Sequence, residues 1–547
     1  MGVINDSDVA SAHLDTWHSI EWARVHRSVR RLQTRIAKAA KDENWRGVSR
    51  LQQLLVRSTA AKAVAVRRVT ENQGRKTPGV DGITWSTPEA KRAGMHTMNS
   101  RGYRPLPLRR VHIPKANGGQ RPLGIPTMRD RAMQALHWLA LDPVAETTGD
   151  PNSYGFRPHR STADAIAQCH NALSRGASPQ WVLEGDIKGC FDNISHDWLL
   201  KHVPMDRTVL SKWLKSGFVE GHRLFPTVAG TPQGGIISPT LANLALDGLE
   251  RRLSLLPRRA KVNFIRYADD FVVTAVSKEL LESQVKPMVR EFLAERGLVL
   301  SESKTRITHV SEGFDFLGWN IRKHKDFLCI TPSKKNSAAF FEKVRIRLRQ
   351  LRGAKQEDVV FALNPIIRGW GNYHRVVHAK RPFAKMDHLI HGALWRWAKR
   401  RHPNKGKRWV KKRYFKVHDS RDWLFNGSTG SLVLLSALKV GKHIKIRSDA
   451  NPYDPLAESY FDERLKRRML ESLMGRRKLF WLWKKQEGCC PICHQGITKA
   501  TGWHVHHRHW RVFGGSDKLS NLQLLHPACH TQLHARAKGD MAAADSR

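Results

Sequence analysis

Acidic residues are scarce in this chain. Its 547 residues include 48 aspartates and glutamates against 94 lysines and arginines, which gives a formal charge of +46. A compact protein with such an excess repels itself unless a polyanion neutralises part of the charge. The basic residues are spread along the whole chain, so we expect extended tracks for nucleic acid instead of one basic tail. A merely soluble, highly charged surface is the simpler explanation, and an excess of this size argues against it.

Long apolar runs and cysteines are also few. No segment reaches the roughly 18–20 apolar residues of a membrane span, so we expect no membrane partner. The first residues lack the basic-then-apolar pattern of a signal peptide, which favours a cytoplasmic protein. Of seven cysteines, Cys169, Cys190 and Cys329 are isolated and the other four cluster near the C-terminus. This distribution predicts a reducing compartment and one metal site, not a disulfide framework.

Two adjacent aspartates, Asp269 and Asp270, stand between apolar runs in the segment FIRYADDFVV. The simpler explanation is a turn between two strands, because aspartate is common in hairpin loops. The alternative is a metal site, since Mg²⁺ prefers oxygen ligands and a shared cation offsets the repulsion of paired carboxylates. A further aspartate, Asp186, ends the apolar run of WVLEGDIKGCFDNI just before a turn into a helix. If the two strands pair, the carboxylates converge on a site that could hold two metal ions for phosphoryl transfer.

Groups suited to binding phosphate occur on both sides of Asp186 in the sequence. Lys115 and Arg121 flank the glycine-containing loop of a predicted hairpin, where they could hold a triphosphate. The segment GTPQGG offers close backbone approach at its glycines and a side-chain amide at Gln233. Glycine-rich loops are common, and only the combination of these pieces in this order points to nucleotide transfer.

Seven segments resemble, in the same order, motifs of the reverse transcriptases of bacterial group II introns. They are KTPGVDGIT (76–84), RPLGIPTMRDR (121–131), SYGFRP (153–158), DIKGCFDNI (186–194), TPQGGIISP (231–239), YADD (267–270) and FDFLGW (314–319). The basic N-terminal helices and the tryptophan-rich segment 335–420 are similar to the family's N-terminal extension and its thumb, or maturase, region. NPYDP followed by YFDERLKRR resembles its DNA-binding region.

The resemblance implies roles for the residues that match. Asp186, Asp269 and Asp270 would be the catalytic aspartates of a polymerase palm. Asp186 and Asp269 would bridge two Mg²⁺ ions, with Asp270 as a supporting ligand. Phe191 would stack under the incoming sugar and exclude a 2′-hydroxyl, although a plain core phenylalanine is the simpler explanation. Gln233 would contact the incoming nucleotide.

A second group of metal-binding residue types lies near the C-terminus. CPIC supplies Cys490 and Cys493, and HPAC supplies His526 and Cys529. These two pairs have the residue types and spacing of a structural Zn²⁺ site. Cys489 is adjacent and could substitute for Cys490. A reducing compartment argues against a disulfide among them.

Histidines and an asparagine around this cluster resemble an HNH, or ββα-metal, nuclease. The resemblance implies a catalytic divalent ion bound by His506, His530 and His534, of which the last two are four residues apart on one helical face. His507 would be the general base that activates water, and Asn521 would orient it.

One departure and one alternative accompany this resemblance. The related intron proteins often carry glutamate where this chain has His504, which changes the expected metal environment. The alternative is a zinc knuckle that grips DNA without cutting it.

We therefore expect a multidomain α/β and α protein: a right-hand polymerase with mixed α/β fingers and palm and a helical thumb, followed by a small zinc-containing ββα-metal HNH domain. Within it, RAMQALHWLALDPVAE predicts an amphipathic helix. The expected domains are 1–75 (basic helical extension), 76–330 (reverse transcriptase fingers and palm), 331–425 (thumb or maturase), 426–484 (DNA-binding region) and 485–547 (HNH).

The implied function is the mobility of a group II intron. The protein would bind the intron RNA and assist its splicing as a maturase. After the RNA inserts into one strand of double-stranded target DNA, the HNH domain would nick the other, and the new 3′-hydroxyl would prime cDNA synthesis from dNTPs. The expected location is the bacterial cytoplasm, with the nucleoid when the protein acts on DNA.

Two rival functions come from other classes. One is an RNA-binding splicing factor with an inactive polymerase, against which the intact aspartates argue. The other is a host-domesticated reverse transcriptase without mobility, against which the HNH and DNA-binding regions argue.

Overall fold

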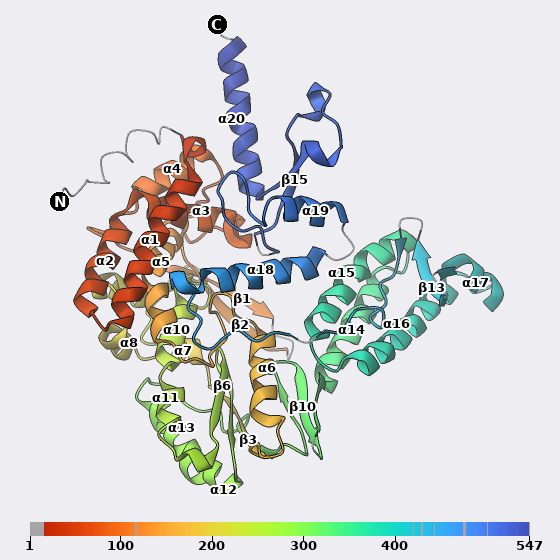
Figure 1. Ribbon diagram of the computed structural model, residues 1–547, viewed down its shortest axis with the longest axis horizontal. Coiled ribbons are helices and arrows are strands. Elements are labelled where there is room, and N and C mark those ends of the chain that lie inside the picture. The colour runs from red at the N-terminus through yellow and green to blue at the C-terminus, as the bar shows by residue number, and fades with distance from the viewer. Residues whose placement is uncertain are drawn as a thin grey trace.

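The computed structural model describes residues 16–114, 118–325, 327–418, 421–427, 430–441, 443–473, 477–499 and 501–545. Lys115 lies outside these residues. Figure 1 shows the N-terminal helices on one side, a helical bundle on the opposite side, and helix α18 (Glu458–Leu473) running between them. Within the described part of the chain, each helix is too short or too polar to cross a lipid bilayer.

Basic helices form the N-terminal part, as expected. They are η1 (Trp17–Ser19), α1 (Trp22–Lys41), α2 (Trp45–Arg57), α3 (Thr59–Glu71), η2 (Gln73–Lys76) and α4 (Pro88–His96). Helix α1 buries Val29, Ile36 and Ala40 at helical spacing and leaves most of its arginines outside.

Helix α5 (Met128–Thr148) is buried on nearly all sides, so the expected amphipathic pattern is wrong although the helix is present. Its polar residues are buried because distant segments supply their partners. Asp142 accepts a hydrogen bond from the hydroxyl of Tyr453, and Glu146 pairs with Arg157 at 2.8 Å. The NPYDP segment, which contains Tyr453, is thereby anchored on α5.

The first sheet has the order β2-β1-β4-β5. Its strands are β1 (Leu108–Pro114), β2 (Gln120–Ile125), β4 (Phe218–Glu220) and β5 (Arg223–Phe225). Strands β1 and β2 form the antiparallel hairpin that the sequence predicts.

The second sheet, in the order β6-β7-β3-β8, carries the aspartates. Its strands are β3 (Trp181–Asp186), β6 (Asn263–Tyr267), β7 (Asp270–Ala275) and β8 (Arg306–His309). The helices before, between and after these strands in the sequence are α6 (Thr162–Leu173), α7 (Cys190–Asn193), α8 (His196–His202), α9 (Arg207–Leu214), α10 (Ser238–Leu246), α11 (Leu249–Leu253), η3 (Arg258–Ala260), α12 (Lys278–Leu280), η4 (Leu281–Val285) and α13 (Lys286–Ala294). Buried Val, Ile and Phe side chains of β3, β6 and β7 belong to two hydrophobic cores, one shared with α6 and the other with α13.

A small sheet leads into the helical bundle. Strands β9 (Phe314–Phe316), β10 (Trp319–His324) and β11 (Phe327–Pro332) pair in the order β11-β10-β9. The bundle that follows is α14 (Lys334–Gln350), α15 (Gln356–His374), α16 (Lys380–Arg401) and α17 (Lys407–Tyr414), with β12 (Phe415–His418), β13 (Arg421–Gly427) and β14 (Gly430–Ser431). The bundle has its own hydrophobic core.

The C-terminal part returns to the body of the protein. It comprises η5 (Pro455–Ala457), α18, α19 (Arg477–Lys485), β15 (His504–His507), η6 (Arg511–Phe513), η7 (Leu519–Asn521), β16 (Leu522–Leu525) and α20 (Pro527–Asp545). Asp164 of α6, fully buried, anchors the segment before α19: it accepts from His443 Nε2 and Ile446 N at 2.9 and 2.8 Å and pairs with Arg464. The region that the sequence analysis expects to bind DNA is thus held against α6 by hydrogen bonds and an ion pair.

Gly155 lets the chain approach the β6–β7 hairpin closely. A Cβ at this position would lie 2.2 Å from the backbone nitrogen of Ala268. We expect Gly155→Ala to lower the free energy of unfolding by about 1–3 kcal/mol, because the overpacked atoms are backbone and must shift. Urea denaturation measures this loss. Gly176→Ala is the matched control, since open space surrounds that glycine and its variant should unfold like the wild type. Equal stability of both variants would contradict the tight packing.

Candidate active site and metal centres

Three carboxylates meet at one end of the β3–β7 ladder. The two strands are antiparallel, and Asp186 lies directly opposite Asp270. Facing side chains in such a ladder have Cβ atoms about 5 Å apart. Asp269 lies in the two-residue loop between Tyr267 and Asp270, which form the last pair of the β6–β7 hairpin. The strand pairing that the sequence analysis required is therefore present.

A buried arginine, Arg266, stabilises the β6–β7 hairpin. Arg266, 1% exposed, pairs with Asp247 and donates from Nη1 to Asn243 Oδ1 at 3.1 Å and to the carbonyl of Ala268 at 3.3 Å. Asn243 in turn donates to the carbonyl of Gly155 at 2.9 Å. Ala268 has φ 58°, a left-handed value that costs free energy for a residue other than glycine. The surrounding contacts hold the loop in this conformation.

The electrostatics of the cluster favour a cation. Burial raises the pKa of Asp269, and Asp186 adds to the effect. Burial and the charges of Asp269 and Asp186 raise the pKa of Asp270 to about 6. Lys304 Nζ lies 2.9 Å from Asp186 Oδ2 and is mostly exposed. One lysine leaves the carboxylates under-neutralised, and oxygen donors of this kind fit Mg²⁺.

Phe191 and Gln233 lie on two segments that pack together beside Asp186. Phe191, on α7, is half-buried and meets the exposed ring of Phe156 edge to face, with centroids 6.0 Å apart. Its carbonyl accepts from Thr231 N at 2.6 Å. Gln233 Nε2 lies 3.3 Å from both carboxylate oxygens of Asp192. Phe191 is thus not enclosed in the core, and Phe156 is a neighbour that the sequence analysis missed.

The glycine-rich loop also contacts the first hairpin. Gly124 N of β2 donates to the carbonyl of Gln233 at 2.8 Å, and a Cβ on Gly234 would lie 2.7 Å from the carbonyl of Gly124. Arg121, exposed on the same strand, partly offsets the rise in the pKa of Asp269. The hairpin, the glycine loop and the carboxylates therefore surround one location.

Two groups of metal-binding side chains occur in the C-terminal part. The ligand atoms of Cys490, Cys493, His526 and Cys529 all lie within 4.8 Å of one another, and all four residues are buried. Cys489 is half-buried and directs its sulfur to the carbonyl of Glu487 at 3.8 Å. Cys490 is therefore the member of the group. Three thiols and an imidazole in this arrangement fit structural Zn²⁺.

The second group consists of His506 on β15 and His530 and His534 on α20. The Nε2 atoms of His530 and His534 are 3.2 Å apart, and each ring lies with its centroid 5.2 Å from that of His506. Burial and the two neighbouring imidazoles lower the pKa of His506 to about 4. A neutral imidazole keeps a lone pair for a metal, so this group could hold a divalent ion.

His507 is held by a residue that the sequence analysis did not single out. Its Nε2 lies 2.7 Å from Asp517 Oδ1, which also binds Arg511. Among the described residues, the side chain of Asn521 forms its hydrogen bonds with backbone groups and none with this ring. Its side chain accepts from His509 N at 2.8 Å and donates to the carbonyls of His509 and Ser516 at 2.9 and 2.7 Å. Any orientation of His507 by Asn521 would therefore act through the loop that follows His507, whose backbone the amide holds, whereas Asp517 contacts the imidazole.

Comparisons with known proteins assign four domains to the chain. The matching family models are an N-terminal domain of reverse transcriptase (residues 17–98), reverse transcriptase, or RNA-dependent DNA polymerase (113–321), the group II intron maturase-specific domain (337–415) and HNH endonuclease (490–536).

Curated relatives agree with these models. Protein YkfC of Escherichia coli K12 is 34% identical over 327 residues, which cover 51% of this chain and 85% of that protein. The group II intron-encoded protein LtrA of Lactococcus lactis subsp. cremoris is 30% identical over 333 residues, covering 47% of this chain and 54% of LtrA. Among solved structures, telomerase from Candida albicans has a TM-score of 0.33 at 13% identity, over 57% of this chain and 66% of that chain, too low a similarity to carry an argument.

The chain carries a polymerase domain of the reverse transcriptase type joined to a maturase domain and a nuclease domain. It belongs to the family of group II intron-encoded reverse transcriptases with a C-terminal HNH endonuclease domain, and the resemblance inferred from the sequence is confirmed.

The raised pKa of Asp270 predicts how pH affects the metal-free protein. A carboxyl group with a folded pKa near 6 contributes stability that is present below its ordinary pKa of 3.8 and is lost as the pH rises through about 6. We expect Asp270→Asn to raise the unfolding temperature at about pH 7.5, with the difference vanishing towards about pH 4. Mg²⁺ should then stabilise the wild type more than the variant.

Thermal unfolding in a metal chelator, repeated across this pH range, checks the expectation. Asp449→Asn is the control, because that side chain is 82% exposed and far from the cluster in sequence. A variant less stable than the wild type at neutral pH would show that the carboxylates do not repel one another.

Proposed function

We propose that the protein is an RNA-directed DNA polymerase, a maturase and a DNA-nicking endonuclease that together mobilise a group II intron. The observation that carries the proposal is the meeting of three carboxylates at adjoining strand ends, beside the glycine loop and the basic hairpin. The polymerase and nuclease domains of the matching family support it. The proposed partners are the intron RNA, double-stranded target DNA and dNTPs.

The polymerase site would use the carboxylates as metal ligands. Asp186 and Asp269 would hold two Mg²⁺ ions, with Asp270 in support, and these ions when bound stabilise charge on the attacking and leaving oxygens. Lys304 would have to leave Asp186, because its ammonium contacts an oxygen that the metal needs. The exposed side chain of Lys304 can make this movement.

The neighbouring residues would position the nucleotide. Arg121 would contact the triphosphate, because its strand β2 meets the glycine loop, and Lys115 is proposed as a second contact from the sequence alone. Gln233 would approach the nucleotide from the other side. Phe191 would press against the 2′ position of the sugar and select dNTPs, supported by the ring of Phe156 at its edge.

The N-terminal helices and the bundle would hold the intron RNA. The bundle's helix α17 reads KRWVKKRY, so five of its eight residues are basic, and Trp409 among them is 39% exposed. Cations interleaved with an exposed aromatic ring suit a phosphate backbone and a stacked base. The protein would favour the RNA's splicing-competent fold, while the chemistry of splicing remains with the RNA.

The HNH domain would nick the second DNA strand. His506, His530 and His534 would hold the catalytic divalent ion, and Zn²⁺ on the four-residue Cys/His cluster would hold the fold of the module. His507 would take a proton from the attacking water, and Asp517 would orient the imidazole and stabilise its protonated form. Asn521 would act through the backbone of the 508–516 loop.

The polymerase and RNA-binding functions should separate. Asp269→Ala removes a metal ligand and little RNA-binding surface, so we expect loss of cDNA synthesis with retained RNA affinity and assisted splicing. Primer extension and a splicing assay on the same preparation measure both, with Asp449→Ala as an active control. Normal cDNA synthesis by the Asp269→Ala variant would contradict the metal-site proposal. An inactive wild type would favour the rival splicing factor.

The base assignment predicts a strand-specific defect. His507→Ala should abolish the nick in the second DNA strand, because it removes the imidazole that would accept the water's proton. RNA insertion into the first strand and extension of a supplied primer should survive. Asp517→Asn should give an intermediate rate, since the imidazole stays but loses its anionic partner. Strand-specific cleavage of labelled duplex DNA measures these rates. Normal nicking by His507→Ala would show that the base is misassigned, and a wild type that never nicks would favour the DNA-gripping knuckle.

A further inference from the structure

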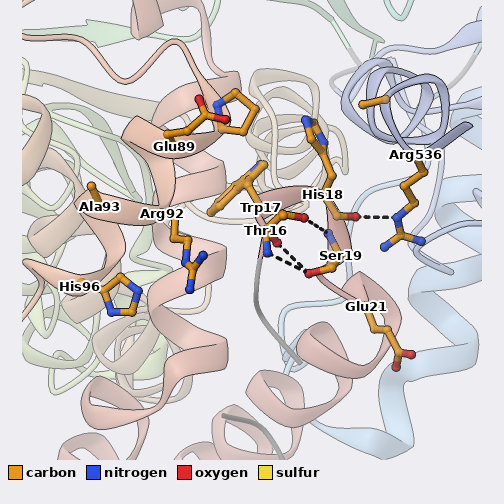
Figure 2. A pocket seen from close by; sticks show the side chains of 12 residues that line it. Thr16, Trp17, His18, Ser19, Glu21, Glu89, Arg92, Ala93, His96 and Arg536 are labelled. Carbon is orange, nitrogen blue, oxygen red and sulfur yellow. Dashed lines mark hydrogen bonds between the residues drawn. The ribbon is translucent and has the colours of Figure 1, made fainter. Parts of the chain in front are cut away.

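The HNH module is packed against the N-terminal helices. Gln532 of α20 donates to the carbonyls of His18 and Ile20 at 2.7 and 3.1 Å, and Arg536 Nε donates to the carbonyl of His18 at 2.5 Å. Figure 2 shows this last bond at the rim of a cavity of about 910 Å³ lined by η1, α4 and α20. One hydrophobic core runs from the N-terminal helices into the module. Two ends of the chain therefore share an interface.

At the centre of this interface, Arg67 reaches the Cys/His cluster. Arg67 lies on α3 and is 9% exposed. Its Nη2 lies 3.3 Å from the sulfur of Cys529, a residue 462 positions later in the sequence. An N–H···S contact of this length is a hydrogen bond. Arginine is almost never buried without a partner, so the contact requires an explanation.

Other residues of the N-terminal helices fix the direction of the guanidinium. Nε donates to Glu71 Oε2 at 3.1 Å, and Nη1 lies 3.5 Å from His26 Nε2. The ring of Trp22 lies 4.4 Å below the guanidinium carbon. Nε and Nη1 are thus held by residues of α3 and α1, and Nη2 is the nitrogen left to meet the sulfur. The cage belongs entirely to α1 and α3.

We propose that Arg67 is an outer ligand of the zinc site, donated to the nuclease module by the N-terminal domain. The inference rests on the proposed zinc site. Three thiolates and a neutral imidazole around Zn²⁺ carry a net charge of −1, which is costly to bury without a counter-charge. Arg67 supplies that charge and a hydrogen bond to a ligand sulfur. Partners of this kind orient and tune metal ligands.

The arrangement links the retention of zinc to the folding of the N-terminal helices. Zinc bound to the cluster stabilises the HNH module. Through the contact between Cys529 and Arg67 it also stabilises α3, against which the module packs. The contact makes Arg67 a positioning residue, since its described partners are Cys529, Glu71, His26 and Trp22, none of which belongs to the His506 group. The HNH module would therefore be an integral part of the body of the protein.

Zinc release from the full-length protein tests the proposal. We compare the wild type with two variants. Arg67→Met removes the positive charge and the N–H donors, and Arg67→Lys keeps the charge but loses the planar guanidinium that reaches several partners at once. Arg68→Met is the matched control, because Arg68 follows on the same helix but stacks on Trp138 at 3.7 Å. A chromogenic chelator reports release at a temperature where circular dichroism shows every variant folded. We expect release about 10- to 100-fold faster for Arg67→Met, less for Arg67→Lys, and near wild type for Arg68→Met.

Cobalt substitution gives a readout that a general loss of packing would not move. A hydrogen bond lowers the energy of the sulfur lone pairs, so its loss should shift the thiolate-to-Co²⁺ charge-transfer band to longer wavelength in Arg67→Met and not in Arg68→Met. If Arg67→Met does not fold, Glu71→Gln, which loosens the guanidinium, should show the same shift in smaller degree. Unchanged bands, or equal release from Arg67→Met and Arg68→Met, would overturn the inference while the zinc site stands. A wild type that binds no zinc would overturn both.

Discussion

Mutual repulsion of three carboxylates at the end of β3 and β7 is the constraint on which the polymerase half depends. Asp186 faces Asp270 across the ladder, and Asp269 occupies the adjacent loop, so the strand pairing fixes the backbone positions from which all three carboxylates extend. Arg266 donates a hydrogen bond to the backbone of that loop and Gly155 packs closely against it, and these contacts keep Ala268 in its unfavourable backbone conformation. A site built this way lowers the stability of the metal-free protein and is stabilised when cations and phosphates bind. Functional sites commonly lower the stability of a protein in this way.

The sequence was most informative where the structural signal is local. Apolar runs and the turn residues beside them predicted the β6–β7 hairpin and the strand that ends at Asp186, a glycine-containing loop predicted the β1–β2 hairpin, and all are present. Cysteine and histidine spacing predicted the Cys/His cluster, because two ligands three residues apart already restrict the geometry, and the resemblance to HNH nucleases implied the His506 group. Family motifs then extended these local patterns to a function.

What the sequence could not show are contacts between residues far apart in the chain. Lys304 is one of 94 basic residues, and only its position beside Asp186 distinguishes it. The amphipathic prediction for α5 was wrong because Tyr453 and other distant groups satisfy its buried polar side chains. Asp517 and Arg67 were missed for the same reason, since a loop and a domain interface decide their partners. Such pairings follow from the tertiary fold, and no local period or spacing encodes them.

The central claim is that one chain cuts a DNA strand and then copies RNA from the end it has made. The most direct measurement supplies the ribonucleoprotein with duplex target DNA labelled on the second strand, together with dNTPs and Mg²⁺, and sequences the labelled products. The account predicts labelled DNA joined at the nick, without a gap, to cDNA of the intron RNA. A nicked strand that is never extended, or cDNA that starts only from an added primer, would contradict it.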